Sequence, residues 1–224
     1  MHDAHQYYDR DQAESYDIAR EQEAHWALEN DFIAAAFADG AAGKIVLDAP
    51  VGTGRFLPCY RQATSIIGVD ASPDMLAMAQ RRVDAEGLRG VELKAADLLA
   101  LPLADTSVDV TVCWRFLHLL PPASLAPTLR ELTRVTRQRI ILQAYIRGPW
   151  LRRSLSRLAR LPSRLRRVMA TSHSSTAPWS HIPAWFHDAH DLHAAVTASG
   201  WRVAQQTRLC HYQGHGVDVL ILEP

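Results

Sequence analysis

The sequence lacks any hydrophobic run that approaches the roughly 20 residues needed to cross a bilayer. Its first eight residues are polar and do not resemble a signal peptide. Cysteine is scarce, and the three that occur, Cys59, Cys113 and Cys210, have no metal-type spacing. An odd number of dispersed cysteines fits reduced thiols better than a disulfide framework. We therefore expect a cytoplasmic protein with no transmembrane segment.

Acidic residues are missing from one long stretch, between Glu131 and Asp188. Residues 1–131 contain 20 acidic and 11 basic residues, whereas residues 132–224 contain 4 acidic and 13 basic ones. The net charge of zero therefore hides an acidic first part and a basic second part. With 48% hydrophobic and 21% charged residues, the 224-residue chain is an ordinary globular protein with ample length for one core.

The chain is organised around residues 44–56, where an apolar run is followed by a glycine turn. The run Ile45–Leu47 has the length of a buried strand, and it breaks at Asp48. Gly52 and Gly54 let the backbone bend sharply and let a ligand approach without a Cβ in the way. If a helix follows, its N–H groups point at that ligand. The pattern predicts a strand, a loop and a helix that hold a nucleotide-like ligand.

Strands alternate with helices along the rest of the chain. Further strands are expected at 65–70, 90–97, 107–114, 139–145, 201–210 and 216–222. One helix is expected within 7–38, and others at 55–62, after the N-cap Ser72, after Pro122 to about 136, and at 190–199. Connections too long for hairpins imply parallel pairing, with the last two strands antiparallel at one edge. The predicted fold class is α/β: a Rossmann-like, doubly wound, seven-stranded and mostly parallel sheet with helices on both faces and an antiparallel final strand.

Four regions are expected: an N-terminal helical flap (1–43), a cofactor-binding core (44–146), a basic helical cap with an acceptor loop (147–188), and the last helix with the closing strand pair (189–224). Within the core, Asp48, Asp70, Asp97 and Trp114 all fall where strands end. Ligands in such sheets bind beyond the carboxyl ends of the strands. Several acids at successive strand ends therefore favour a binding site over isolated helix caps.

The core resembles the class I S-adenosylmethionine-dependent methyltransferases, especially those that act on small molecules. The matching segments are 46–54 (VLDAPVGTG), 68–76 (GVDASPDML), 95–98 (AADL), 101–103 (LPL), 107–110 (SVDV) and 116–120 (FLHLL). The resemblance implies that S-adenosyl-L-methionine is the cofactor and S-adenosyl-L-homocysteine the product. It covers residues 44–145 by motif and the remainder by topology only.

The resemblance also implies a role for each matching position. The loop from Asp48 to Gly54 would hold the methionine and ribose portion, and Asp70 would accept hydrogen bonds from both ribose hydroxyls. Asp97 and the backbone of Leu98 would bind the adenine. The complete implied set of cofactor-binding residues is Tyr16, Asp48, Ala49, Gly52, Thr53, Gly54, Asp70, Ala71, Met75, Ala96, Asp97, Leu98 and Trp114.

Some features depart from the family pattern or keep an alternative open. An acid after the second strand also occurs in NAD-binding folds, but position 57 is Leu, so the third glycine of that motif is missing. Ala49 stands at the first motif glycine and is followed by Pro50, where the family often has Gly-x, and residues 136–139 stand where the family has a Pro-Gly-Gly turn. The expected strand pair at the C-terminus favours a methyltransferase over a dehydrogenase.

The Arg-rich segment 147–167 combines an apolar helical stripe with eight arginines. It is read either as a cap helix with a solvated face or as a surface for an anionic membrane or RNA. Residues 171–187 would form a loop at the acceptor site. His187, His190 and His193 drift around a helix and complete no cluster of ligands, so no metal is expected.

Methyl transfer needs alignment of nucleophile and methyl group, and a base only where the acceptor keeps its proton. His118 is the first candidate on the acceptor side, although a histidine packed in a Leu-rich turn is an equally good interpretation. Arg115 would pair with an anionic acceptor, while Tyr8 and His181 are further candidates. Tyr7, Tyr8 and Tyr16 belong either to a flap over the cofactor or to ordinary packing.

The sequence thus predicts a methyltransferase for a small-molecule or lipid-like acceptor. An RNA methyltransferase and a non-catalytic cofactor-binding subunit are the alternatives.

Overall fold

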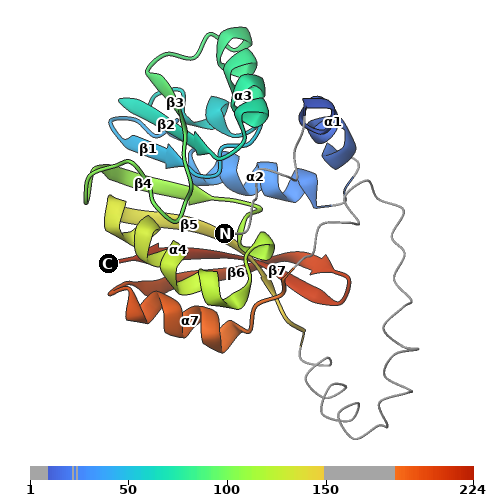
Figure 1. The fold of residues 1–224 in the computed structure, drawn as a ribbon, viewed down its shortest axis with the longest axis vertical. Coiled ribbons are helices and arrows are strands. Elements are labelled where there is room, and N and C mark those ends of the chain that lie inside the picture. Colours follow the sequence, from blue (N-terminus) through green and yellow to red (C-terminus); the bar gives the residue numbers. More distant parts are fainter. Residues whose placement is uncertain (1–9, 22, 24, 149–184) are drawn as a thin grey trace, which may run out of the picture.

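A seven-stranded sheet forms the centre of the molecule (Figure 1). The computed structural model describes residues 10–21, 23, 25–148 and 185–224. The strand order is β3-β2-β1-β4-β5-β7-β6. Their bounds are β1 Ile45–Asp48, β2 Ser65–Asp70, β3 Val91–Ala95, β4 Val108–Cys113, β5 Thr136–Ile146, β6 Arg202–Tyr212 and β7 His215–Glu223.

The first five strands run parallel, and β7 pairs antiparallel with both β5 and β6. The order reverses between β1 and β4, which places a topological switch point at the carboxyl end of β1. Long connections produce the parallel pairs, and the two-residue turn between β6 and β7 produces the antiparallel hairpin. The predicted fold class is confirmed.

Helices cover both faces of the sheet (Figure 1). Their bounds are α1 Arg10–Glu21, α2 Trp26–Ala36, α3 Pro73–Ala85, α4 Pro122–Val135 and α7 Ala189–Ala198, with short 3₁₀ helices η2 Leu57–Tyr60 and η3 Leu117–Leu119. The helices α4 and α7 lie side by side and pack on one face, while α2 and α3 pack on the other. Successive residues of a strand point to opposite faces of the sheet. Leu47 therefore packs in the core beneath α4 and α7, and Val46 in the core beneath α2 and α3.

The N-terminal region contains two helices instead of the single predicted one. Hydrogen-bonded turns from Glu23 N–H to Arg20 C=O and from Trp26 N–H to Glu23 C=O separate α1 from α2. This break brings the Glu23 side chain within 2.7 Å of Arg115. Of the predicted apolar face, Trp26, Ile33 and Phe37 are buried.

Two further predictions about local structure were wrong. The helix expected at 55–62 is only the 3₁₀ helix η2. The Gly54 N–H donates to the Val51 carbonyl in a tight turn, and Pro58 lacks the N–H that a longer helix would need. The glycine turn is therefore followed by a 3₁₀ helix and not by the expected longer helix. The strand expected at 139–145 begins earlier, at Thr136, and follows α4 directly. The buried Thr136 hydroxyl stabilises this transition by donating to the Leu132 carbonyl at 2.6 Å.

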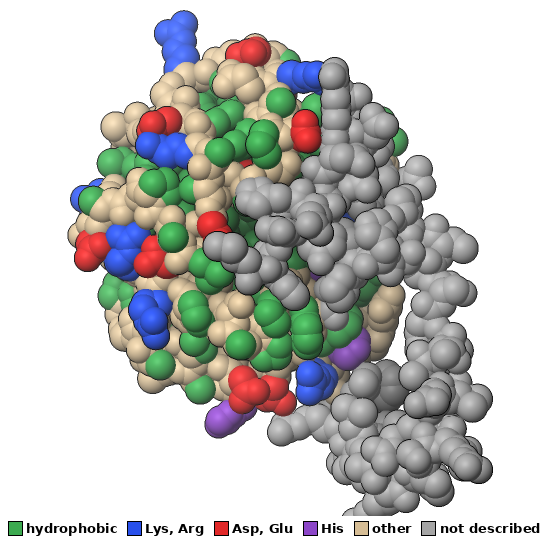
Figure 2. Space-filling view, viewed as in Figure 1, with side chains coloured by type: hydrophobic (Ala, Val, Ile, Leu, Met, Phe, Trp, Pro, Cys, Tyr) green, Lys and Arg blue, Asp and Glu red, His purple; other side chains and the backbone are tan. Residues whose placement is uncertain are grey.

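Most of the predicted cap, 149–184, lies outside the described residues, so the four-region division stays a prediction. Within the described part of the chain, no helix is long and apolar enough to span a membrane. On the face shown in Figure 2, the described Lys and Arg side chains are interspersed with Asp and Glu. The described side chains on this face therefore create no large electrostatic potential of a single sign.

Candidate active site

Asp70, the last residue of β2, presents a carboxylate whose orientation is fixed by the backbone. Its Oδ2 accepts from Gly52 N–H at 2.9 Å, and its Oδ1 accepts from Ser72 N–H at 2.9 Å. Ser72 caps α3, as predicted, by accepting from Met75 N–H. Each carboxylate oxygen has a second lone pair, so the fixed group can still accept from a diol.

The glycine turn is shaped by two residues with left-handed backbones, Gly52 (φ 53°) and Gly54 (φ 75°). A Cβ at Gly54 would lie 2.8 Å from Leu57 Cδ1 and 3.1 Å from Ala79 Cα, so glycine is required there for packing. A Cβ at Gly52 would meet no other described atom within 4 Å. The space in front of Gly52 is thus open to a ligand. The Ala49–Pro50 peptide bond is cis, and Ala49 is buried.

Asp48 differs from Asp70 although both end neighbouring strands. It is 2% exposed, and the fully buried Tyr60 hydroxyl lies 3.4 Å from its Oδ2. Burial raises the pKa of Asp48 well above its ordinary range; the Tyr60 hydrogen bond opposes this shift and the charge of Asp70 adds to it. The environment of Asp48 therefore disfavours the charged form of its carboxyl group.

The other predicted cofactor-binding residues near Asp70 follow the ends of β2 and β3 or lie in α3. Ala96 N–H donates to the Asp70 carbonyl at 3.1 Å, which holds the end of β3 next to the end of β2. Asp97 accepts from Leu99 N–H at 2.9 Å, while Leu98 and Met75 are buried. Ala71 links Asp70 to the α3 cap. Their roles toward the cofactor stay predictions.

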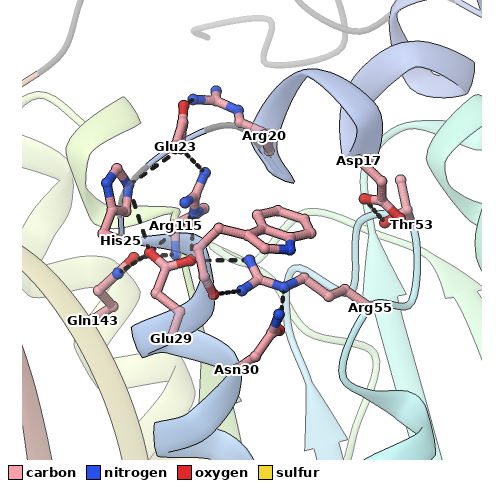
Figure 3. Close-up of polar contacts among 11 residues, drawn as sticks. Asp17, Arg20, Glu23, His25, Glu29, Asn30, Thr53, Arg55, Arg115 and Gln143 are labelled. Carbon is pink, nitrogen blue, oxygen red and sulfur yellow. Dashed lines mark hydrogen bonds and ion pairs between the residues drawn. The ribbon is translucent and has the colours of Figure 1, made fainter.

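Helix α1 is attached to the glycine turn. The Thr53 hydroxyl donates to Asp17 at 2.8 Å (Figure 3). Asp17 also pairs with Arg82 of α3 at 2.5 Å. Tyr16 precedes this contact and lies under the guanidinium of Arg20, 5.2 Å from ring centroid to Cζ. Helix α1 is thus fixed directly on the turn, while its role as a flap over the cofactor stays a prediction.

A buried ionic cluster lies beside the carboxyl end of β4 (Figure 3). At its centre is Glu29 of α2, which is 0% exposed. Glu29 accepts from Arg55 at 2.9 Å, from Arg115 at 2.9 Å and from the Gln143 amide at 2.7 Å. Arg55 also covers the Trp26 ring, with its Cζ 3.3 Å from the centroid. These contacts join α2, the glycine turn, β4 and β5 at one point.

Arg115 is the most constrained member of this cluster. Its φ is +50°, a conformation that costs a non-glycine residue about 1–2 kcal/mol. Its Nη1 donates to Glu23 at 2.7 Å, its Nε donates to Glu29, and its backbone N–H donates to Gln143. Burial disfavours its charge, but Glu29 and other neighbours raise the pKa of Arg115, so it stays protonated.

His118 follows Arg115 by three residues, in η3. Its ring lies 4.7 Å from the ring of Tyr145 at the end of β5. Burial, reinforced by the positive charges of Arg20 and Arg115, lowers the pKa of His118 to about 3. The imidazole is therefore neutral at pH 7 and is a weak proton acceptor.

Aromatic side chains continue from His118 toward the β6–β7 hairpin. The Tyr145 ring lies 6.2 Å from Phe186 and 5.9 Å from Tyr212, and Phe186 stacks on His215 at 3.6 Å. We call Tyr145, Phe186, Tyr212 and His215 the aromatic group. It occupies the carboxyl end of β5, across the switch point from Asp70.

Other predicted residues have different environments. Trp114 is 4% exposed and packs between Phe32 and Phe56, so a role near the adenosine stays a prediction. Tyr7, Tyr8 and His181 lie outside the described residues. His187 bonds the Leu117 carbonyl and His193 bonds Gln206, so each has a structural partner. Among the described residues, no three potential metal ligands lie together.

Sequence reasoning missed Glu29, Gln143, Arg55 and Tyr145. Two signals could have found part of the cluster. Glu29 falls on the apolar face that Trp26 and Ile33 define, and Gln143 interrupts an otherwise apolar strand. A polar side chain at a buried position usually has a hydrogen-bond partner, so the positions of Glu29 and Gln143 each indicated an interaction but did not identify the partner.

A glycine turn at the switch point, with a fixed carboxylate at the next strand end, defines a nucleotide-cofactor-binding α/β domain. Residues 46–139 match the family described as a methyltransferase domain. The chain therefore carries a class I S-adenosylmethionine-dependent methyltransferase domain, which confirms the family predicted from its motifs.

The chain is 34% identical over 99 residues to a phosphatidylethanolamine N-methyltransferase of Cereibacter sphaeroides, covering 44% of this chain and 48% of that protein. It is 37% identical over 98 residues to a demethylmenaquinone methyltransferase of Thermus thermophilus, covering 42% and 43%. These matches span less than half the length of either relative.

The crystal structure of magnesium protoporphyrin IX methyltransferase from Synechocystis PCC 6803, with bound S-adenosylhomocysteine, shares the fold. The TM-score is 0.69 at 16% identity, covering 98% of this chain and 96% of that one.

Proposed function

We propose that this chain transfers a methyl group from S-adenosylmethionine to a small-molecule or lipid-like acceptor. The observation that carries the proposal is the Asp70 carboxylate, held by Gly52 and Ser72 N–H groups beside a glycine with open space before it. This arrangement lies inside the segment that matches the methyltransferase family.

The residues present fit the cofactor. Asp70 retains acceptor capacity for the two ribose hydroxyls, and the open side of Gly52 leaves room for the methionine and ribose portion. Asp97 would accept from the adenine amino group, and Leu98 would supply a backbone N–H. When bound, the cofactor supplies an electrophilic methyl group on a sulfonium.

The contribution of the chain is then to orient the acceptor and exclude water. His118, neutral and weakly basic, serves that task by hydrogen bonding and packing better than by proton abstraction. The aromatic group offers apolar surface on the acceptor side. Relatives named for phosphatidylethanolamine and demethylmenaquinone support an acceptor with a large apolar part.

An RNA acceptor is not favoured by any described residue. The proposal for RNA or an anionic membrane rests on residues 147–167, of which only Arg147 and Gly148 are described. Both of these bond to the body of the protein: Arg147 to His187 and Phe186 carbonyls, and Gly148 N–H to His215.

Thermal unfolding with S-adenosylhomocysteine tests cofactor binding. At about 100 times its Kd, a ligand that binds only the folded state stabilises it by about 2.7 kcal/mol. We expect that stabilisation in the wild type and its loss in Asp70→Ala. Asp84→Ala, at the exposed far end of α3, is the matched control and should keep it.

No stabilisation of the wild type would refute the proposal. Stabilisation without methyl transfer to any acceptor, in assays that include quinones, aminolipids and aromatic acids, would instead favour a non-catalytic cofactor-binding subunit.

A further inference from the structure

We infer that Arg115 and His118 form a binding site for the carboxylate of an aromatic or otherwise apolar methyl acceptor. The inference rests on the proposed function and names the class of acceptor. Its basis is a pair of buried polar atoms that have no hydrogen-bond partner among the described residues, placed where the ionic cluster meets the aromatic group.

Arg115 uses only part of its guanidinium in the cluster. Its side chain is 8% exposed, and Nη1 and Nε donate to Glu23 and Glu29. Its Nη2 is buried and has no hydrogen-bond partner among the described residues. A buried, charged donor left unpaired costs free energy, and a charge-assisted bond to an anionic oxygen would recover it.

The carboxylates near Arg115 are also bound to other guanidinium groups. Glu29 accepts from Arg55 as well as Arg115, and Glu23 lies 2.5 Å from Arg20 as well as 2.7 Å from Arg115. Arg115 therefore has no carboxylate of its own. Three guanidinium groups, those of Arg20, Arg55 and Arg115, share two carboxylates, so these ion pairs leave one positive charge in excess that a further anion can balance.

His118 supplies the second unpaired atom. Its Nδ1 is buried with no hydrogen-bond partner in the described part of the chain. The Arg115 backbone N–H contacts Gln143 and the His118 ring contacts Tyr145, and these two β5 residues are two positions apart and so lie on the same side of the strand. A neutral imidazole with its proton on Nδ1 donates to an anionic oxygen, and Arg115 Nη2 donates to the other oxygen of the same carboxylate.

The surroundings indicate what carries that carboxylate. The His118 ring packs on Tyr145, and the aromatic group extends from there to the β6–β7 hairpin. Flat or apolar molecules pack well against such rings. Apart from Tyr16 and Trp114, the groups expected to bind the cofactor lie at or after the ends of β1, β2 and β3, on the other side of the switch point. The carboxylate therefore belongs to the acceptor.

Matched pairs of an acid and its amide test the inference. The probes are 2-naphthoate with 2-naphthamide and cinnamate with cinnamamide, titrated by calorimetry into protein saturated with S-adenosylhomocysteine. In each pair, only the charge changes while the apolar body stays the same. For the wild type we expect the acid to bind about 10- to 100-fold more tightly, as for a charge-assisted hydrogen bond.

Two variants and one control locate the preference. Arg115→Gln should bring the ratio of acid to amide affinity close to one, and His118→Phe should lower it several-fold while leaving the Arg115 ion pairs in place. Arg134→Gln removes a guanidinium of α4 that pairs with Glu131 on the same helix and with Asp105 before β4, and should leave the ratio unchanged. Because the readout is a ratio, a general loss of stability does not move it.

Three results would overturn the inference. One is no preference for either acid in the wild type, including no binding of either pair. Another is a preference for the acids that both variants keep. If Arg115→Gln does not fold, the result for His118→Phe decides alone. The third is a loss of S-adenosylhomocysteine affinity in Arg115→Gln without loss of 5′-methylthioadenosine affinity, which would assign the site to the cofactor's own carboxylate. If the protein binds no S-adenosylhomocysteine, the proposed function fails first, and the same pairs titrated without it still decide the carboxylate site.

Discussion

At the carboxyl ends of β1, β2 and β3, the candidate site is built largely by the backbone. Gly52 and Ser72 N–H groups fix Asp70, and positive φ angles shape the glycine turn. Beyond β4 and β5 the site is built by side chains from distant segments: Glu29 contacts residues up to 114 positions away. Backbone-built sites tolerate exchange of neighbouring side chains, whereas a buried ionic cluster depends on every member.

Removing the centre of the ionic cluster should have the largest effect on stability. Glu29→Gln leaves Arg55 and Arg115 buried without their shared counter-charge, which should lower the free energy of unfolding by about 3–5 kcal/mol. Urea denaturation measures the loss. Glu86→Gln, which breaks an exposed pair with Arg61, should cost no more than about 1 kcal/mol. Equal urea midpoints for the two variants would show that the cluster contributes no more than a surface pair.

The contrast between the two regions also explains which parts could be predicted from sequence. The glycine turn, Asp70 and the Ser72 cap are local signals, because the residues that make each contact are at most 18 positions apart. The parallel pairing followed from the alternation of strands and helices. The start of β5 and the helix at 55–62 were mispredicted, because the Thr136–Leu132 and Gly54–Val51 hydrogen bonds that decide them are not contained in a residue pattern.

The acceptor side could be predicted only in part. Arg115 and His118 were identified from their place after a strand, but their partners were not. Glu29 and Gln143 meet only after α2 packs against β5, so no spacing in the sequence links them. The low pKa of His118 likewise depends on burial and on Arg20, 98 positions earlier in the chain. Long-range packing, and not propensity, decides this half of the site.

The two glycines of the turn should separate stability from ligand binding. Gly54→Ala places a methyl against Leu57 and Ala79 at a positive φ, and should cost about 2–4 kcal/mol of stability. Gly52→Ala meets open space, so only the backbone conformation is penalised, by about 1–2 kcal/mol. Denaturation and S-adenosylhomocysteine titration of both variants provide the comparison.

For ligand binding, Gly52→Ala should have a larger effect than Gly54→Ala, the reverse of their order for stability. The new methyl at Gly52 would stand in the space proposed for the cofactor and should weaken S-adenosylhomocysteine binding by about tenfold or more, which corresponds to about 1.4 kcal/mol. Gly54→Ala, once folded, should bind nearly as well as the wild type. Unchanged affinity in Gly52→Ala would place the cofactor elsewhere.

The smallest effect concerns the pH dependence of the acceptor side. His118 has a folded-state pKa of about 3, below the ordinary 6.5, so the unfolded chain binds its proton more readily than the folded protein does. The stability that follows from a neutral His118 is complete above about pH 6.5 and is lost progressively as the pH falls toward 3. At pH 5 the loss should reach at most about 2 kcal/mol.

His118→Phe should therefore lose less stability than the wild type between pH 7 and pH 5, as measured by urea denaturation at each pH. Burial also lowers the pKa of His187 and of His215, so both proteins should still lose some stability over this range. The difference between their slopes isolates His118, whose ring faces the charges of Arg20, Arg115 and Glu23. His190→Phe changes an exposed ring on α7 and should leave the wild-type slope intact. Identical slopes for His118→Phe and the wild type would mean that solvent reaches this imidazole, and the side-chain-built half of the site would then be wetter and less dependent on its buried charges than its contacts indicate.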